Sequence, residues 1–231
     1  MWLLSIILPC MLLTTNACSP SDEPIKTEEP TPVPDPEPEP NPDPTPDPTP
    51  SGGRALVVYF SCTNTTKGIA DRIVEVTDAA TWRINPEVAY TSEDLNYNNS
   101  SSRANREQND PSARPAIKGK CENLADYDVV FLGYPIWWGK APKVIFTFLE
   151  SHDLAGKTVV PFCTSHSSGI GSSDTDLHRL AAGAEWKQGR RFGGSESKET
   201  IEKWIESMDL NFNDNTNTGV FDLSKGTNGN A

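Results

Sequence analysis

Three short, unbroken apolar runs constrain what this chain can fold into. They lie at residues 55–60 (ALVVYF), 129–132 (VVFL) and 159–163 (VVPFC). Runs of this length without alternating polar residues are typical of strands buried on both faces, as in a parallel sheet covered by helices. Amphipathic stretches with helical spacing come after the first two runs, at residues 67–76 and 142–151. The sequence therefore alternates between buried strands and surface helices.

Weaker signals extend this alternation. Residues 81–84 and a short stretch at 190–192 have the character of strands, and apolar residues recur at helical spacing in 177–184 and 201–208. Parallel strands joined through helices take right-handed crossovers. We therefore expect an α/β fold, a doubly wound, five-stranded parallel sheet with helices on both faces.

The first 18 residues have the features of an export signal. Residues 2–13 are almost wholly apolar, too short to cross a bilayer as a helix but of the length of a secretory signal core. The small residue Ala17 precedes Cys18 as in a lipoprotein signal, although Thr15 stands where leucine is usual and no basic residue precedes the apolar run. We expect Cys18 to carry a lipid anchor. The alternative is ordinary signal cleavage, with Cys18 lost or unmodified.

The next segment, residues 19–53, is rich in proline, aspartate, glutamate and threonine and cannot form a core. Alternating proline favours extended polyproline II, so we interpret the segment as a solvated spacer rather than a recognition sequence. It holds nine acidic residues and one lysine, which is most of the chain's net charge of -12. The rest of the chain is nearly neutral, so we expect no nucleic-acid partner.

Residues 54–209 are long enough for one domain with a single core. Within them, residues 86–126 are rich in Asn, Ser, Asp and Arg and break the alternation, which marks an insertion. We expect it to be either a lid beside a site or a passive surface loop, and its weakly helical part, 92–108, does not justify assigning a helix. Residues 210–231 have the composition of a loose C-terminal tail, with 220–223 as a candidate edge strand.

A hydroxyl-rich turn joins the first strand to the first helix. Its residues are Ser61, Cys62, Thr63, Asn64, Thr65 and Thr66. Backbone amides at a helix N-terminus, helped by hydroxyls, can bind a phosphate without any basic side chain. The turn lacks the G-x-G-x-x-G pattern and the lysine of a P-loop, so neither a dinucleotide fingerprint nor a phosphate-transferring loop is predicted. Ordinary helix capping would also explain these residues.

A second loop follows residues 129–132 and is unusually aromatic. Gly133, Pro135 and Gly139 punctuate it, as is usual for a loop, but its remaining residues are large and apolar: Tyr134, Ile136, Trp137 and Trp138. Open α/β sheets bind ligands at the carboxyl ends of their strands, so we expect this loop to form one wall of a site for a flat molecule. The alternative is that both tryptophans cap the core.

The third loop, residues 164–173, combines small residues with His166. Gly169 and Gly171 permit close approach of the backbone to a ligand. In a sheet of order 2-1-3-4-5, the ends of the first, third and fourth strands adjoin the switch point, so the three loops would converge there. A phosphate at one end and a planar ring between the other two loops would be the geometry of bound FMN.

Three strings of this sequence carry a resemblance to a known family. FSCTNTT (60–66) resembles the FSxTGNT phosphate loop of bacterial flavodoxin-like proteins, GYPIWWGKAP (133–142) resembles their GYPIWW loop, and TSHSSGIGSS (164–173) follows in the expected place. The resemblance covers essentially all of 54–209 and implies a flavodoxin-like sandwich that binds FMN. Asn64 departs from the pattern, which has glycine there, although asparagine tolerates positive φ.

The resemblance also implies which residues bind the cofactor. The phosphate loop contributes Ser61, Cys62, Thr63, Asn64, Thr65 and Thr66. One side of the isoalloxazine would contact Pro135, Ile136, Trp137, Trp138 and Gly139, and the other Ser165, His166, Gly169, Ile170 and Gly171. Either tryptophan is a candidate for stacking on the ring. His166 is a candidate for the pyrimidine edge, or else a surface histidine.

Cysteine and histidine positions add little chemistry. Beyond the signal and Cys18, the cysteines are Cys62, Cys121 and Cys163, so at most one disulfide can form, and we expect none between Cys62 and Cys163 because a strand separates them. Cys62 is either a redox thiol or a small buried loop residue. The three histidines show no metal-ligand spacing, so we expect no metal.

Three classes of function remain compatible with the sequence. An FMN electron carrier or flavin-dependent oxidoreductase uses all three loops and would act with a redox partner protein or a small acceptor such as a quinone; no catalytic residue is assigned. A cell-surface binding module that keeps the fold without FMN is the alternative. A hydrolase using His166 with Ser167 or Ser168 is third, since G-x-S-x-G is absent. The signal predicts an exported, membrane-anchored bacterial lipoprotein.

Overall fold

A computed structural model of the chain describes residues 55–210. The predicted signal, Cys18, the spacer and the candidate strand at 220–223 lie outside these residues. The strands are β1 (Ala55–Tyr59), β2 (Ala80–Arg83), β3 (Val129–Pro135), β4 (Thr158–Thr164), β5 (Glu185–Trp186) and β6 (Arg190–Phe192). The helices are α1 (Thr65–Thr77), α2 (Arg103–Asn109), α3 (Lys143–Ser151), α4 (Thr175–His178) and α5 (Lys198–Glu206), with 3-10 turns η1 (Leu124–Asp126) and η2 (Arg179–Ala181).

The strands form a parallel sheet in the order β2-β1-β3-β4-β5, which confirms the predicted fold. The fifth position is shared by two short strands that follow one another along β4. Thr158 and Val159 pair with β5, and the last three residues of β4 pair with β6. The three residues between β5 and β6, 187–189, interrupt the pairing.

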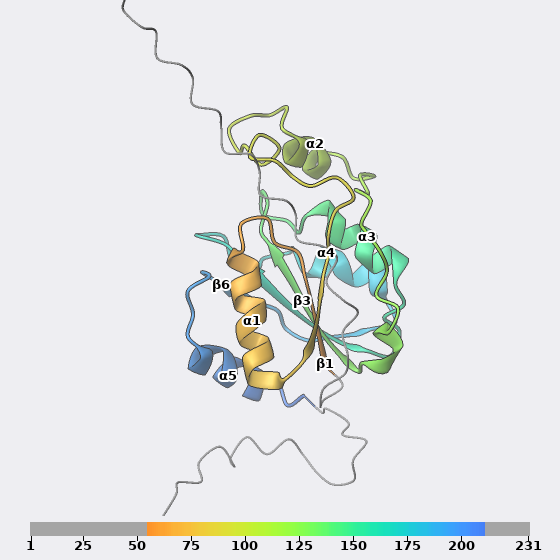
Figure 1. Ribbon diagram of the computed structural model, residues 1–231, viewed down its shortest axis with the longest axis vertical. Coiled ribbons are helices and arrows are strands. Elements are labelled where there is room, and N and C mark those ends of the chain that lie inside the picture. The colour runs from red at the N-terminus through yellow and green to blue at the C-terminus, as the bar shows by residue number, and fades with distance from the viewer. Residues whose placement is uncertain (1–54, 211–231) are drawn as a thin grey trace, which may run out of the picture. The chain divides into compact units, whose positions relative to one another are not determined.

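Helices cover both faces of the sheet, α1 and α5 on one and α3 and α4 on the other (Figure 1). Alternate residues of each strand point to opposite faces. Val57 of β1 therefore packs in the cluster under α1 and α5, while Leu56 and Val58 pack in the cluster under α3. Each face has its own buried core, so the sheet is held between two helical layers. None of the helices within residues 55–210 is long and apolar enough to cross a bilayer.

Strand β3 is longer than the sequence predicts. The turn expected after Leu132 begins only after Pro135, and Tyr134, assigned to the loop, is a buried strand residue with its hydroxyl 3.1 Å from Ser173 Oγ. Gly133 explains why β3 extends beyond its predicted end at Leu132. A Cβ at this position would lie 2.1 Å from Phe162 Cζ on β4, so glycine serves close packing between strands here rather than a turn.

Two further segments differ from expectation. The helix expected at 177–184 is only the four-residue α4 continued by η2. The insertion contains one helix, α2, at the end of the weakly helical stretch, and this helix lies beyond the carboxyl end of β3 (Figure 1).

Candidate functional site

A cavity of about 200 Å³ lies at the carboxyl ends of β1 and β3. Three segments contribute to its wall: the first loop, the aromatic second loop and the insertion. The lining residues are Ser61, Cys62, Thr63, Thr66, Leu95, Tyr97, Ala104, Pro135, Trp137 and Trp138. None of these side chains carries a charge. The cavity is polar at its hydroxyl-rich end and apolar at its aromatic end.

Asn64 sets the geometry of the first loop. It precedes α1 with φ 61° and ψ 2°, the left-handed conformation that glycine adopts most easily and that asparagine tolerates. Its side chain makes no capping hydrogen bond among the described residues. The amide groups of the first helical turn have no partner within a helix, so they are available to an anion together with the positive end of the helix dipole.

Ser61 and Thr66 are the buried polar residues of this loop, and of the two only Thr66 has a side-chain hydrogen-bond partner among the described residues. Only 3% of the surface of Ser61 is exposed, and its Oγ has no hydrogen-bond partner among residues 55–210. A buried hydroxyl without a partner is destabilising, so a ligand oxygen in the cavity would restore a lost hydrogen bond. Arg83 of β2 donates from Nη2 to the Ser61 carbonyl oxygen at 2.8 Å and so braces the loop from outside the cavity.

The second loop closes as a tight hairpin turn. Trp137 and Lys140 exchange two main-chain hydrogen bonds of 2.9 and 3.0 Å. The two residues between them have positive φ, 47° at Trp138 and 76° at Gly139. Positive φ is ordinary for glycine but costly for a bulky side chain, and such strain is concentrated at binding sites.

The two tryptophans have different surroundings. Trp137 packs edge-on against Phe60 and Tyr90, with ring centroids 5.5 and 5.2 Å away, and joins the core cluster. Trp138 instead stacks face to face on Tyr97, with centroids 4.1 Å apart and planes 8° apart. The core-capping interpretation therefore describes Trp137, while Trp138 presents its ring face to the insertion.

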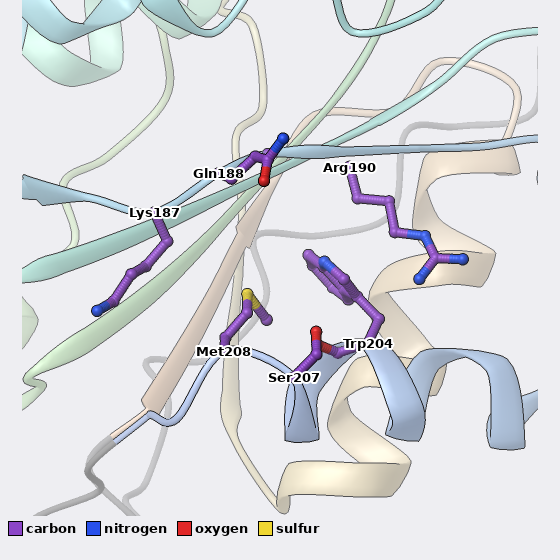
Figure 2. A pocket seen from close by; sticks show the side chains of 7 residues that line it. Lys187, Gln188, Arg190, Trp204, Ser207 and Met208 are labelled. Atoms are coloured by element: carbon purple, nitrogen blue, oxygen red, sulfur yellow. The ribbon is translucent and has the colours of Figure 1, made fainter.

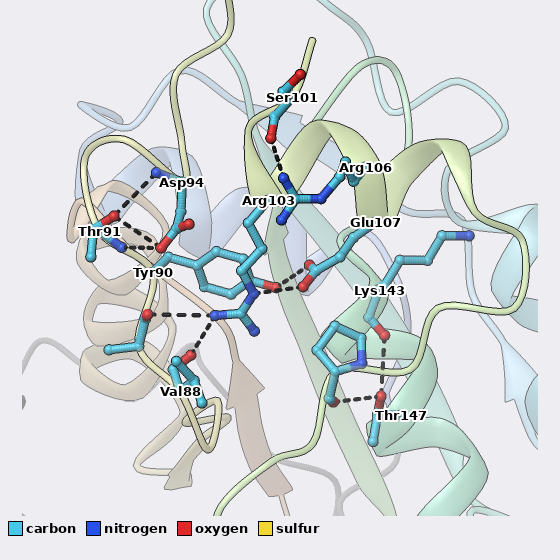
Figure 3. Close-up of polar contacts among 12 residues, drawn as sticks. Val88, Tyr90, Thr91, Asp94, Ser101, Arg103, Arg106, Glu107, Lys143 and Thr147 are labelled. Atoms are coloured by element: carbon cyan, nitrogen blue, oxygen red, sulfur yellow. Dashed lines mark hydrogen bonds and ion pairs between the residues drawn. The ribbon is translucent and has the colours of Figure 1, made fainter. Parts of the chain in front are cut away.

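The insertion is a wall of the cavity. Gln108 of α2 donates to the carbonyl oxygens of Trp137 and Ala141 at 3.0 and 3.2 Å. Arg103 pairs with Glu107 at 2.7 Å, and the hydroxyl of Tyr90 donates to the same carboxylate (Figure 3). These contacts fix the base of the insertion beside the second loop. A lid beside a site is one of the two alternatives that the sequence left open, but the lining residues Leu95, Tyr97 and Ala104 could not be predicted individually, because they form no periodic pattern.

The third loop does not line this cavity. His166, Gly169 and Gly171 are exposed, while Ser165 and Ile170 are half-buried. Arg191 of β6 donates to the carbonyl oxygens of Ser165 and His166 and so holds the loop against the sheet.

The first loop and the third loop are nevertheless joined through β4. The hydroxyls of Thr66 on α1 and Thr164 at the end of β4 lie 2.8 Å apart in a buried position. After β6, Gly194 reaches the same region, since a Cβ there would lie 2.5 Å from Thr65 Cγ2. The sequence places Thr164 in the third loop but does not predict its contact with Thr66, nor the position of Gly194, because both depend on strand order rather than on any local motif.

The cysteines offer no reactive thiolate here. Among the described residues, Cys62, Cys121 and Cys163 form no disulfide. Burial raises the pKa of the Cys62 and Cys163 thiols to about 12, so both stay protonated at neutral pH.

A second cavity, of about 420 Å³, lies between the segment joining β5 to β6 and helix α5 (Figure 2). Its lining includes Lys187, Arg190, Trp204 and Met208. It contains none of the residues that the three loops contribute.

Comparison with known proteins agrees with this architecture. Residues 54–208 match the family model described as Flavodoxin. The chain belongs to the flavodoxin family. No match was found among curated proteins.

Solved relatives of this flavodoxin-family chain are flavoproteins by description. A candidate flavoprotein from Bacteroides eggerthii DSM 20697 is 45% identical, with a TM-score of 0.66, over 69% of this chain and 99% of its own. Another from Bacteroides uniformis ATCC 8492 is 42% identical, with a TM-score of 0.64, over 68% and 99%. A flavoprotein from Lactobacillus acidophilus NCFM in complex with FMN shares the fold at 20% identity and a TM-score of 0.52, over 66% of this chain and 99% of its own.

The chemistry of the residues present suits a flavin mononucleotide. An uncharged, hydroxyl-rich helix N-terminus suits a phosphate, and the unpartnered Ser61 Oγ supplies a buried hydrogen-bonding group next to it. The aromatic end of the cavity suits a planar ring. The two ends are continuous within one cavity, as a molecule with a phosphate tail and a flat head requires.

Proposed function

We propose that this chain binds FMN at the carboxyl end of its sheet and acts in electron transfer, either as a carrier or as a flavin-dependent oxidoreductase. One observation supports this most strongly: the buried, unpartnered Ser61 hydroxyl lies in an uncharged cavity that joins the start of α1 to Trp138. FMN, when bound, supplies one- and two-electron redox chemistry. The protein supplies binding, orientation and the charges around the ring.

The phosphate end of the proposed site consists of hydroxyls and main-chain amides. Thr63 and Thr66 line the cavity, and the Thr63 and Thr65 hydroxyls lie 3.2 Å apart at the mouth of the loop. A phosphate would accept hydrogen bonds from these groups and from the first-turn amides of α1. Substituting Thr63 and Thr65 together by valine should weaken binding of FMN much more than that of lumiflavin, which lacks the phosphate. Equal losses for both ligands would contradict this assignment.

Positive charge beside the first loop has a consequence for the redox potential. Arg83 donates to the Ser61 carbonyl oxygen and acts on the Cys62 thiol, whereas Arg103, which also acts on this thiol, is paired with Glu107. A positive field favours the anionic form of a reduced flavin over the neutral oxidised form. We therefore propose that the chain favours the reduced cofactor, and that Arg83→Gln lowers the midpoint potential of the bound flavin in a dye-equilibration titration.

The electron donor that the protein accepts distinguishes an electron carrier from an oxidoreductase. A redox partner protein or a small acceptor such as a quinone would take electrons from the bound flavin. An oxidoreductase should oxidise NADH or NADPH in the presence of a quinone or azo acceptor, whereas a carrier should do so only when a separate reductase is added. A chain that keeps the fold but binds no FMN, as a cell-surface binding module would, should show neither activity.

We also propose that the protein is an exported lipoprotein anchored through Cys18. The apolar residues 2–13, the Ala17–Cys18 step and the proline-rich spacer of 19–53 support this. A chain with Cys18→Ser, expressed in a bacterium, should move from the membrane fraction to the soluble exported fraction. Retention of the variant in membranes would contradict a lipid anchor at this residue.

A further inference from the structure

Tyr97 of the insertion already makes the two contacts that the second loop offers to a flat ligand. Its ring lies parallel to Trp138, with centroids 4.1 Å apart and planes 8° apart. Its hydroxyl oxygen accepts a hydrogen bond of 3.0 Å from the Trp138 main-chain amide. Both residues line the cavity. One aromatic ring with an oxygen at its edge therefore occupies both the ring face and the amide of Trp138.

Little else holds Tyr97 in place. It is 57% exposed, one of the two exposed large hydrophobic side chains among the described residues. The hydrogen bonds of the neighbouring residues stay within the insertion, as between Thr91 and Asp94, between Asn96 and Asn98, and from the Ala104 amide to the Asp94 carbonyl oxygen. The base of the insertion is fixed separately, through Gln108 on Trp137 and through the Arg103–Glu107 pair. Tyr97 can therefore leave Trp138 without unfolding the insertion.

The cavity is too small for a tricyclic ring while Tyr97 stays in place. Its volume is about 200 Å³. Small-molecule pockets measure roughly 300 to 1,000 Å³. The additional space next to Trp138 is the space that the Tyr97 ring fills, and no ring can enter between two planes that are already in stacking contact.

We propose that Tyr97 is an internal substitute for the ligand's ring, so that the site takes a planar aromatic ligand with a hydrogen-bond acceptor on its edge, and this ligand displaces Tyr97 from Trp138. The inference rests on the proposed function, since the isoalloxazine of FMN has this chemistry. It assigns the insertion a role in determining affinity. The free chain must first give up the Tyr97 contacts before the ring can bind. Its apparent affinity is therefore the affinity of the open form multiplied by the fraction of molecules that are open.

Two substitutions separate the contacts of Tyr97. Tyr97→Ala removes both the stacking and the hydrogen bond, whereas Tyr97→Phe keeps the ring and removes only the hydroxyl. Val88→Ala is the matched control, because Val88 is the other exposed large side chain, at 65%, and does not line the cavity. The variants are made in residues 54–231, which contain the domain that the solved relatives form almost alone, at 99% of their length.

Each protein is titrated with FMN and with lumiflavin, which has the ring but no phosphate. Tyr97→Ala should bind both ligands more tightly, by about threefold to tenfold, because the stacking and the hydrogen bond between Tyr97 and Trp138 no longer compete with the ligand. Tyr97→Phe should show a smaller gain of about twofold to threefold. Val88→Ala should match the unsubstituted chain. An equal gain for both ligands places the effect at the ring rather than at the phosphate.

A second measurement needs no ligand. Hydrogen exchange of the Trp138 amide reports directly on its bond to Tyr97, and Tyr97→Phe should accelerate it while Val88→Ala leaves it unchanged. Addition of lumiflavin to Tyr97→Phe should restore protection, because an acceptor atom of the ligand then accepts the hydrogen bond of the Trp138 amide.

The outcomes separate this inference from the proposed function. If the unsubstituted chain binds FMN and Tyr97→Ala binds it more weakly or equally, Tyr97 is not displaced and the inference is wrong, while FMN binding stands. Should neither chain bind FMN or lumiflavin, both are wrong. Binding by Tyr97→Ala alone would support the inference and contradict FMN binding by the natural chain.

Discussion

Thr66 and Thr164 lie 98 residues apart in sequence, and their hydroxyls meet at 2.8 Å in a buried position. The bond ties the first turn of α1 to the last residue of β4. Helix α1 begins at the proposed phosphate site and β4 leads into the third loop, so one hydrogen bond sets the distance between the proposed phosphate site and the third loop. Its strength should be measurable in both stability and binding.

Thr164→Val should destabilise the domain, because it leaves the buried Thr66 hydroxyl without its partner. A loss of about 1–3 kcal/mol in the free energy of unfolding is expected, measured by urea denaturation. The double variant Thr66→Val/Thr164→Val should be more stable than Thr164→Val alone, since it removes the unpaired group. Additive losses in the double variant would show that the hydrogen bond contributes nothing specific.

Asn64 can be tested against the glycine that the family pattern has at this position. Its φ of 61° is left-handed. Asn64→Gly should therefore leave stability and FMN affinity almost unchanged, whereas Asn64→Ala should cost about 1 kcal/mol and weaken FMN binding. Asp78, with φ 53° at the C-terminus of α1 and far from the cavity lining, gives the control. Asp78→Ala should cost stability but leave FMN affinity unchanged.

The fold could be predicted from the sequence because the three central strands, β1, β3 and β4, each carry their own local signal. Runs such as residues 55–60 are apolar on both faces, and the helices between them have clear stripes. Strand β5 could not be predicted, because its two residues, the exposed Glu185 and the half-buried Trp186, carry no such pattern. The sequence predicts too short a β3, because Gly133 has the character of a turn residue, whereas in the fold the Phe162 ring requires a residue without a side chain there.

The candidate site was only partly accessible to sequence reasoning. The first and second loops are local strings, and the structure brings members of both into one cavity. Tyr97 reaches Trp138 across 41 residues, and Gln108 reaches Trp137 across 29. Such contacts depend on how the insertion folds back, and its polar composition gives no periodic signal from which to predict them. Whether the third loop contacts a ligand stays a prediction.

Gly194 should position the proposed phosphate loop. It has φ 106°, and an added Cβ would lie 2.5 Å from Thr65 Cγ2. Gly194→Ala should therefore displace the start of α1 and weaken FMN binding, measured by fluorescence titration. Gly119→Ala is the control, since Gly119 also has positive φ, 68°, but an added Cβ would meet nothing within 4 Å. Similar FMN affinities for the two variants would contradict a positioning role.

The two tryptophans should differ when replaced. Trp137→Ala removes the packing against Phe60 and Tyr90 and, because Trp137 is only half-buried, should cost somewhat less than the roughly 3–5 kcal/mol in unfolding free energy of a fully buried tryptophan. Trp138→Ala should leave stability nearly unchanged but weaken FMN binding by about threefold to tenfold, through loss of stacking. Unchanged FMN affinity in both variants would remove the stacking argument.

His152 should make the domain sensitive to mild acid. Its Nε2 accepts a hydrogen bond of 3.0 Å from the Cys121 amide and its Nδ1 lies 3.0 Å from the Phe148 carbonyl oxygen, so the ring is neutral. Burial lowers its pKa below the ordinary value of 6.5. The unfolded chain therefore takes up this proton first as pH falls below 6.5, and stability decreases down to the folded-state pKa.

The decrease should amount to about 1.4 kcal/mol for each unit by which the two pKa values differ. His152→Gln can still accept from the Cys121 amide and does not titrate, so the difference between its stability and that of the unsubstituted chain should change between pH 7 and 5. Urea denaturation at several pH values measures this. A constant difference across that range would exclude His152 as the titrating group.

The most direct test of the account is whether residues 54–231 retain FMN. The purified protein is incubated with excess FMN, passed through a desalting column and examined by visible absorbance and fluorescence. We expect flavin absorbance to co-elute with the protein at close to one equivalent, with the flavin fluorescence quenched by the neighbouring indoles. A correctly folded but colourless protein would contradict FMN binding and leave only the architecture of the family.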